Sequence, residues 1–271
     1  MSGSVTIPGV RSTYDDALRQ PIARMVPIEA PIAIEVNGIA YAVMMATPTD
    51  IEDFVTGFLL GEDLATMAEL GAVAVHRVDD AQLGDGYVAR TNLPAHRAAA
   101  VMERARRRVS DSACGLCGME SIELALRPLP VLAPRPIAAD GAVHRALQRL
   151  GDHQRLGGAT GATHAAAYCA IEGGIEVVRE DVGRHNALDK VIGALALQGR
   201  DASAGFMIVT SRCSFELVEK AVRARCPVLV SISAPTDLAV RRARAAGLAL
   251  AVLARDDSML WVSGPAVSEM G

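Results

Sequence analysis

The chain has 271 residues, of which 51% are hydrophobic and only 3% are aromatic, so aliphatic side chains must build its core. The formal net charge of −4 argues against a general nucleic-acid binder, which usually carries a strongly basic domain. No apolar run reaches the roughly 18 residues that a membrane span needs, and the N-terminus lacks the pattern of a secretory signal. We therefore expect a cytoplasmic protein without a nucleic-acid or membrane partner, folded as one large or two smaller domains.

The first part of the chain predicts a small α+β unit. Residues 1–25 are polar and interrupted by Pro, and we expect a flexible segment there. Asn37-Gly38 stands between two apolar runs and predicts a hairpin, because both residues tolerate the positive φ of a two-residue turn. Thr49 is the expected N-cap of a helix over 50–65. Two strands and a basic helix follow, at 72–80, 86–91 and 95–109.

The second part predicts a larger α/β unit. A helix is expected over 142–156, and the Gly-rich run "GGATGATH" leads into a strand but lacks the Gly-Lys-Ser/Thr ending of an ATPase P-loop. From residue 175, apolar runs alternate with amphipathic helices, which predicts parallel strands joined by crossovers. We expect strands at 175–180, 205–211, 227–234 and 248–255, and helices at 189–199, 214–225 and 236–247. Thr236 and Gly247 are the expected caps of the last helix.

Ligands of such a sheet bind outside the carboxyl ends of its strands. These ends carry hydroxyl groups and the arginines Arg179, Arg212 and Arg255, and guanidinium groups bind phosphate well. The pattern favours a nucleotide-like ligand, with His164 as a further polar contact. Ordinary helix caps and surface ion pairs are the alternative for each residue alone. The string "REDVGRHNALDK" (179–190) follows a strand end, which favours a functional role over a solvated helix start.

The stretch "SDSACGLCGME" carries Cys114 and Cys117 between glycines. Five cysteines is an odd number, and in a reducing compartment a close pair is more often catalytic or metal-binding than structural. A structural zinc site needs four ligands and the chain has no second pair, so we predict no metal. Nucleobase deamination needs a His-x-Glu motif, which the six histidines do not supply.

A dithiol redox role of Cys114 and Cys117 stays open, because CxxC spacing lowers a thiol pKa. The flanking glycines permit close approach by a partner, which suits handing a sulfur atom between two sites.

Several strings together resemble one known family. They are "NGIAYAVMMATPTDIEDFVTGFLLGE", "CGLCG", "TGATHAAA", "EDVGRHNALDKVIG", "TSRCSFELVEKA" and "VSISAPTDLAVRRARAAGLAL". They are similar to the FdhD family of formate dehydrogenase accessory sulfurtransferases, and the likeness runs from about residue 26 to residue 262. The "EDVGRHNALDK" string is the most specific of them.

The resemblance implies an α/β fold in which a cytidine-deaminase-like α/β/α domain (121–271) follows a small α+β domain (26–109) and a mobile CxxC loop (110–120). It also implies a homodimer. In the family, a cysteine desulfurase passes sulfur to the loop as a persulfide. The protein then delivers that sulfur to the molybdenum, or tungsten, ion of the bis-pyranopterin guanine dinucleotide cofactor, and the catalytic subunit of formate dehydrogenase receives the cofactor.

The resemblance also implies site residues. Cys114 is the expected persulfide carrier and Cys117 assists it. The family's cofactor-binding stretch corresponds to Leu253, Ala254, Arg255, Asp256, Asp257 and Ser258. Here the chain departs from the family's Lys-Pro-Gly-Arg-like sequence, since two acids near nucleotide phosphates would repel them unless turned away. Arg184, Ser211, Arg212, Ser233 and Arg255, with His164, are the further residues expected to hold the cofactor.

Two alternative functions belong to other classes. A non-catalytic chaperone would bind the cofactor and dock it into its apoenzyme without needing the cysteines. A CxxC dithiol oxidoreductase would form a reversible disulfide and bind no guanine nucleotide.

Overall fold

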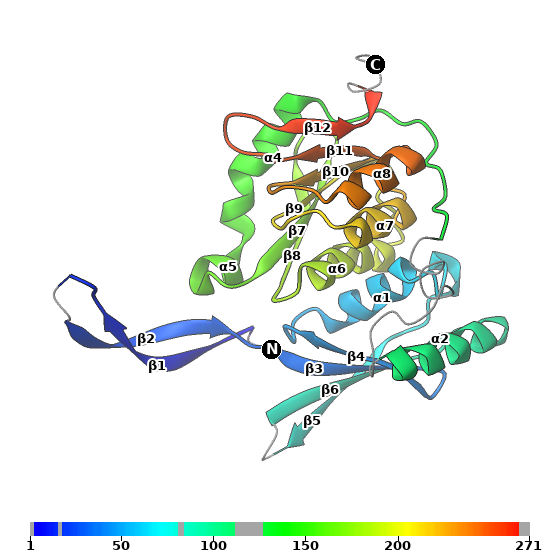
Figure 1. Ribbon diagram of the computed structural model, residues 1–271. Coiled ribbons are helices and arrows are strands. Elements are labelled where there is room, and N and C mark those ends of the chain that lie inside the picture. Colours follow the sequence, from blue (N-terminus) through cyan, green and yellow to red (C-terminus); the bar gives the residue numbers. More distant parts are fainter. Residues whose placement is uncertain (1–2, 16–17, 81–83, 112–126, 266–271) are drawn as a thin grey trace.

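The computed structural model describes residues 3–15, 18–80, 84–111 and 127–265, which form an N-terminal arm and two α/β units (Figure 1). None of the helices in these ranges is long and apolar enough to cross a membrane.

The chain starts with β1 (Ser4–Ser12) and β2 (Arg19–Pro27), which pair as an antiparallel two-stranded ladder. This β1–β2 arm extends away from the rest of the molecule (Figure 1). The sequence predicted a flexible segment over 1–25 and missed both strands. Pro8 and Pro21 hid them, since Pro within an apolar run argues against a central strand and is tolerated only at an edge.

The smaller unit is a four-stranded sheet with the order β4-β3-β6-β5, covered by helices. Its strands are β3 (Ala30–Val36), β4 (Ile39–Ala46), β5 (Ala74–Asp80) and β6 (Gly84–Thr91). Its helices are α1 (Ile51–Gly61), η1 (Met67–Glu69), η2 (Ala95–Arg97) and α2 (Ala98–Asp111). The predicted hairpin is confirmed, with φ of 53° at Asn37 and 75° at Gly38. Thr49 is not the cap of α1, because Asp50 takes the N-cap position in a left-handed conformation.

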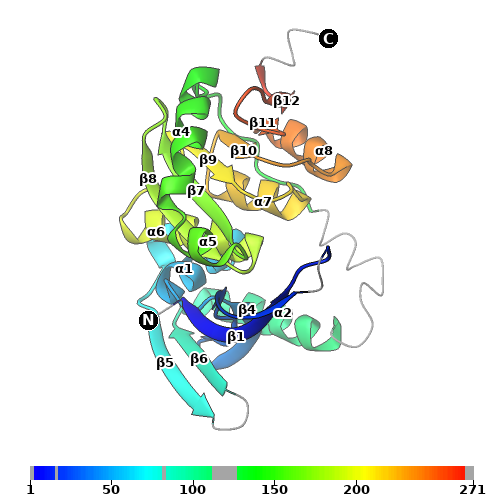
Figure 2. The same cartoon turned by 90° about the vertical axis from the view of Figure 1, so that its left-hand side faces the viewer.

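The larger unit is a six-stranded sheet with the order β12-β11-β10-β9-β7-β8. Its strands are β7 (His164–Ala170), β8 (Ile175–Asp181), β9 (Gly205–Val209), β10 (Val228–Ser231), β11 (Ala249–Val252) and β12 (Leu260–Ser263). Its helices are α4 (Asp140–His153), α5 (Arg155–Thr160), α6 (Arg184–Leu197), α7 (Phe215–Arg223) and α8 (Asp237–Ala246). The helices α6, α7 and α8 pack on one face of the sheet and α4 on the other, so the unit is a three-layer α/β/α sandwich (Figures 1 and 2).

Strand direction agrees only in part with the predicted parallel sheet. The strands β9, β10 and β11 are parallel, as expected. However, β7 lies antiparallel between β8 and β9, and β12 is an antiparallel edge strand that the sequence did not predict. Because β8 and β9 are both antiparallel to β7, they run in the same direction. The carboxyl ends of β8, β9, β10 and β11 therefore share one edge, which we call the carboxyl edge.

Two differences between expected and observed helix boundaries concern the carboxyl edge. The helix α6 starts at Arg184 and not at residue 189, so the middle of the "REDVGRHNALDK" string is helical. The expected Gly-rich turn after α4 is the short helix α5, which ends at Gly161 with φ of 68°. The caps of α8 are confirmed: Thr236 accepts a hydrogen bond from the Ala239 amide, and Gly247 is left-handed.

The two units meet where α1 crosses α6. A Cβ atom on Gly57 would lie 1.8 Å from the Asp189 carbonyl oxygen, and one on Gly193 would lie 1.8 Å from the Asp53 carbonyl oxygen. Both positions therefore require glycine, because the two backbones approach too closely for any side chain. This close crossing fixes the smaller unit against α6 of the larger one.

Candidate functional site

The carboxyl edge brings together several residues that the sequence singled out. Strand register pairs His164, the first residue of β7, with Asp181, the last of β8. Ser211 follows β9, and the amide of Ala254 donates to the Ser231 carbonyl at the end of β10. The Leu253 amide donates to the Ser233 carbonyl. Residues from five strand ends thus line one side of the molecule.

The serines at this edge have two different roles. The Ser231 side chain is fully buried, and its Oγ lies 2.7 Å from the Ser211 carbonyl oxygen and accepts from the Ser233 amide. The Ser211 side chain is also buried, and its hydroxyl donates to the Arg212 carbonyl at 3.0 Å. These two hydroxyl groups hold neighbouring loops together. Ser233 is only half-buried and is therefore the serine of this group that a ligand can reach.

Three arginines follow strand ends at the carboxyl edge: Arg184 after β8, Arg212 after β9 and Arg255 after β11. Arg184, Arg212 and Arg255 form no ion pair within the described part of the chain, so these three guanidinium groups keep their charge for a ligand. His164 is half-buried, and burial together with the nearby Arg184 charge lowers its pKa below the ordinary value. A bound anion would offset the positive charge of Arg184 and would favour protonation of the neighbouring imidazole.

One contact at this edge was not among the predicted site residues. His185 Nε2 lies 3.0 Å from Glu216 Oε2 and 3.2 Å from Ser214 Oγ. The hydrogen bond from His185 lowers the pKa of Glu216. Because one imidazole nitrogen meets both groups, this is not the relay of a hydrolase triad, in which the acid binds the other nitrogen. The sequence signal was the position of Ser214 at the N-cap of α7.

Most of the "REDVGRHNALDK" string is structural. Asp181 and Lys190 are fully buried and form an ion pair of 2.7 Å. The Lys190 ammonium also donates to the carbonyls of Thr47 and Glu180, at 3.0 and 3.1 Å. Asp181 accepts from the Thr47 amide, and Asn186 donates to both Asp181 and the Met45 carbonyl. These bonds join the two units at the carboxyl edge.

Two further charges of the string have partners elsewhere. Arg179 Nε lies 2.7 Å from Asp53 Oδ2 on α1, so this arginine faces the smaller unit and not a ligand. Asp189 is buried against the Lys220 ammonium at 2.7 Å, and burial raises its pKa to about 6. Of the residues in this string, Arg184 and His185 therefore remain the candidates for contact with a ligand.

The stretch 253–258, which the sequence analysis expects to bind the cofactor, divides into two parts. Leu253 and Ala254 are held at the carboxyl edge, with Leu253 in a left-handed conformation and Ala254 buried. The next residues form a turn, closed by a 2.8 Å hydrogen bond from the Arg255 amide to the Ser258 carbonyl. This turn and α4 line a cavity of about 560 Å³, whose polar side chains are Asp140, His144, Arg255, Asp256, Asp257 and Ser258.

Cys114 and Cys117 lie outside the described residues, but the neighbouring chain is placed. Arg104 on α2 and Arg127 both donate to the Glu62 carbonyl at the end of α1. Burial and the charges of Arg223 and Arg104 lower the pKa of Arg127. The chain on either side of the cysteines is thus fixed to one point of the smaller unit.

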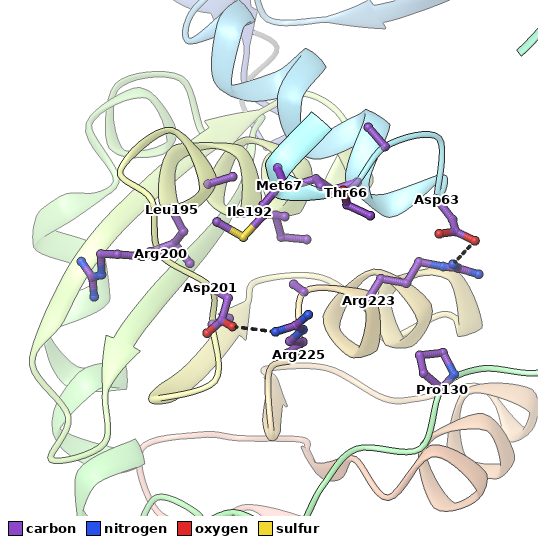
Figure 3. Close-up of a pocket in the computed structure, with 16 residues that line it drawn as sticks. Asp63, Thr66, Met67, Pro130, Ile192, Leu195, Arg200, Asp201, Arg223 and Arg225 are labelled. Atoms are coloured by element: carbon purple, nitrogen blue, oxygen red, sulfur yellow. Dashed lines mark ion pairs between the residues drawn. The ribbon is translucent and has the colours of Figure 1, made fainter. Parts of the chain in front are cut away.

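A second cavity lies beside this point. It has a volume of about 420 Å³ and lies between α1, η1, α6 and the end of α7. Met67, Ile192 and Leu195 give it an apolar wall, and ion pairs between Asp63 and Arg223 and between Asp201 and Arg225 border it (Figure 3). It opens at the amino ends of the parallel strands, because the helices that line it end there, so it is distinct from the carboxyl edge.

The three described cysteines are inert. Cys169, Cys213 and Cys226 have no exposed surface, and burial raises the pKa of each thiol to about 12. A thiol must form a thiolate and be reached to act as a nucleophile. Cys213, which follows β9 at the carboxyl edge, is therefore a small buried side chain.

Comparison with known proteins now adds to the geometry. The FdhD/NarQ family description matches residues 27–267. The chain belongs to the FdhD/NarQ family. The sulfur carrier protein FdhD of Xanthomonas axonopodis pv. citri is 47% identical over 249 residues, covering 91% of this chain and 86% of that protein. The sulfur carrier protein FdhD of Variovorax paradoxus is 45% identical over 240 residues, covering 89% of this chain and 85% of that protein.

A crystal structure supports the fold of this FdhD/NarQ chain. It is that of a protein from Desulfotalea psychrophila assigned as a formate dehydrogenase accessory protein. Superposition gives a TM-score of 0.76 at 23% identity, covering 98% of this chain and 99% of that one. At this identity the likeness establishes the fold but not a shared chemistry.

Proposed function

We propose that the protein is a sulfurtransferase that accepts sulfur as a persulfide on Cys114 from a cysteine desulfurase. It transfers this sulfur to the molybdenum bis-pyranopterin guanine dinucleotide cofactor, which the catalytic subunit of formate dehydrogenase then receives. Membership of the family and the CxxC pair support the proposal.

The observation that carries the proposal is the state of the other cysteines. Sulfur transfer between proteins needs a thiolate that a partner can approach. The described thiols are fully buried and have raised pKa values, so they do not meet this need. The transfer role falls to Cys114 and Cys117, the two remaining cysteines of the chain.

The chemistry balances as thiol–persulfide exchange. The Cys114 thiolate attacks the terminal sulfur of the donor's persulfide, the donor's S–S bond breaks, and the donor cysteine leaves as a thiolate. Cys117 then attacks the Sγ of Cys114, and the terminal sulfur leaves as hydrosulfide with the electron pair of the broken bond. The pair becomes a disulfide, which a small dithiol reductant returns to two thiols. The hydrosulfide is the form of sulfur that a molybdenum ion binds.

The carboxyl edge is the proposed cofactor site. The cofactor carries guanine nucleotide phosphates, and Arg184 and Arg212 supply guanidinium groups that have no ion-pair partner among the described residues. His164, Ser211 and Ser233 lie at the same edge, with Leu253 and Ala254 beside them. The exposed Arg255, Asp256, Asp257 and Ser258 lie on the turn that follows, where the two acids can point away from the phosphates.

Further parts of the proposal follow from the family likeness. They are a homodimer, a cytoplasmic location and a cytidine-deaminase-like form of the larger unit, and the three-layer α/β/α sandwich is compatible with the last. The domain limits at 26–109, 110–120 and 121–271 belong to the same proposal.

Two variants test the proposal separately. Cys114→Ala should abolish activation of formate dehydrogenase while leaving the fold and GDP binding intact, and an active variant would refute the persulfide role. Arg184→Gln should weaken GDP binding at least fivefold, since a charge-assisted phosphate contact is lost. Arg241→Gln is the matched control, because Arg241 is exposed on α8 and paired with Asp237. Equal GDP affinity of the wild type, Arg184→Gln and Arg241→Gln would show that the carboxyl edge is not part of the cofactor site.

A further inference from the structure

The β1–β2 arm exposes apolar side chains on both of its faces. Val5 and Ile7 are 48% and 42% exposed and lie on one face, since side chains two residues apart in a strand point to the same side. Val10, on the opposite face, is 64% exposed, and Leu18 is 47% exposed near the turn. Contiguous exposed apolar side chains on a protein mark a surface for interaction.

The arm is attached to the body only near its base in the described contacts. The Arg24 guanidinium, which lies opposite Ile7 in the ladder, donates to the Thr160 carbonyl of α5 at 2.8 Å. The ladder itself closes at its base, where the Ile28 amide donates to the Gly3 carbonyl at 2.9 Å. From there it extends outward (Figure 1). A two-stranded ladder exposed on both faces is marginally stable in water by itself. Contact with a second protein would bury the exposed apolar side chains and stabilise the ladder.

The base of the arm lies next to the carboxyl edge. Thr160, which holds Arg24, is the last residue of α5, and the chain then runs through Thr163 to His164 at that edge. A protein that takes the cofactor from the carboxyl edge must approach this side of the molecule. It meets the arm when it does so.

The composition and size of the arm indicate what kind of surface fits it. The strands β1 and β2 carry the exposed Arg11 and Arg19 but no acidic residue, so the complement is an apolar strip bordered by carboxylates. Nine residues per strand give a length of about 30 Å and a face of roughly 300 Å². A stable dimer buries about 800 Å² on each partner, so the arm fits a transient encounter better than a permanent second copy. Pro8 and Pro21 oppose strand addition, which leaves the side-chain faces as the contact.

We propose that the β1–β2 arm is the docking surface for the protein that receives the cofactor, and that Val5 and Ile7 contact an apolar strip on it. This inference rests on the proposed function, because it takes the carboxyl edge as the place from which the cofactor leaves. The arm captures the acceptor, and the carboxyl edge holds the cargo.

The test uses the full-length protein carrying Val5→Thr together with Ile7→Thr. Threonine keeps the β-branched shape that a strand prefers and removes apolar surface. The control is Val131→Thr, which changes a valine that is even more exposed, at 75%, and that lies beside the start of β10 and so at the opposite edge of the sheet. For each protein we would measure affinity for the purified, cofactor-free catalytic subunit of a formate dehydrogenase, affinity for GDP, and mass by light scattering.

The proposal expects at least fivefold weaker binding of the cofactor-free subunit by the double variant, with GDP affinity and mass equal to those of the wild type and the control. Wild-type affinity of the double variant for the subunit would overturn the proposal. So would a fall in its own mass with subunit binding unchanged, which would assign the arm to a second copy of this chain. Loss of GDP affinity in the double variant would make the arm part of the cofactor site and would also overturn it. Failure of the wild type to bind GDP would refute the proposed function itself. The GDP measurement on the wild type shows this outcome independently of the arm variant.

Discussion

Asp181 and Lys190 form a fully buried ion pair of 2.7 Å, and each partner also makes a hydrogen bond to the backbone of Thr47 in the smaller unit. The last residue of β8 is thereby fixed from both units at once. The turn that follows carries Arg184 and His185 to the carboxyl edge. The buried pair thus places the cationic end of α6 where a phosphate would bind.

Asp181→Asn should destabilise the protein strongly, because it leaves the Lys190 ammonium buried without a counter-charge. Breaking one partner of a buried pair costs about 3–5 kcal/mol. Denaturant unfolding would measure the loss. Arg77→Gln is the control, since Arg77 pairs with Asp79 and Asp85 on the exposed β5–β6 hairpin and such pairs contribute about 1 kcal/mol or less. Equal stability of the two variants would contradict the importance of the buried pair.

Gly57→Ala should separate α1 from α6. The new Cβ would lie 1.8 Å from the Asp189 carbonyl oxygen, which is backbone and cannot turn away. We expect a loss of about 3 kcal/mol in the free energy of unfolding. Gly151→Ala in α4 is the matched control, because a Cβ there meets nothing within 4 Å and Ala favours a helix by about 0.5–1 kcal/mol. A Gly57→Ala protein as stable as the wild type would show that the helices cross at a greater distance.

Alkylation should distinguish the two classes of cysteine. At about pH 8, iodoacetamide should label Cys114 and Cys117 in the native protein and leave Cys169, Cys213 and Cys226 unmodified, since their thiols are buried and their pKa values are about 12. Denaturant should expose all five. Peptide mass spectrometry gives the sites. Native labelling of Cys213 would contradict its burial and reopen the choice of sulfur carrier.

GDP affinity should rise as the pH falls from about 8 to about 6. Burial and the charge of Arg184 hold the pKa of His164 below its ordinary value, so the imidazole of the unliganded protein is neutral at neutral pH. The neighbouring Asp181 raises this pKa, while His185 lowers it. A bound phosphate would favour the imidazolium form, so binding takes up a proton. His164→Asn should remove the pH dependence that comes from the imidazole and keep the part that comes from titration of the GDP phosphates. An unchanged slope in His164→Asn would exclude contact between the imidazole and the phosphates.

Local sequence signals predicted the elements whose geometry they determine. Asn37-Gly38 imposes positive φ and gave the hairpin, and Thr236 and Gly247 gave the limits of α8. The direction of β7 was not predictable, because apolar alternation is the same for a strand running either way. The short, half-exposed β12 has too weak a pattern to detect.

The candidate site was predictable in position but not in detail. The rule that ligands bind at carboxyl strand ends located the edge, and the insertion of β7 did not disturb it. The burial of Asp181 and Lys190 was hidden because Thr47, their partner, lies far upstream in the sequence. The charged string 179–190 therefore has the sequence pattern of a solvated or ligand-binding surface, although in the structure it forms a contact between the two units. The hydrogen bond from the Ser231 hydroxyl to the Ser211 carbonyl was hidden for the same reason, because 20 residues separate the two.

Mass spectrometry of the peptide that contains Cys114 and Cys117, after incubation with a cysteine desulfurase and cysteine, tests the central claim most directly. We predict a gain of one sulfur atom on Cys114 that a reductant removes, that requires the desulfurase, and that persists in Cys213→Ala. An unmodified peptide in a protein that still binds GDP would contradict sulfur transfer and would favour a chaperone that carries the cofactor alone.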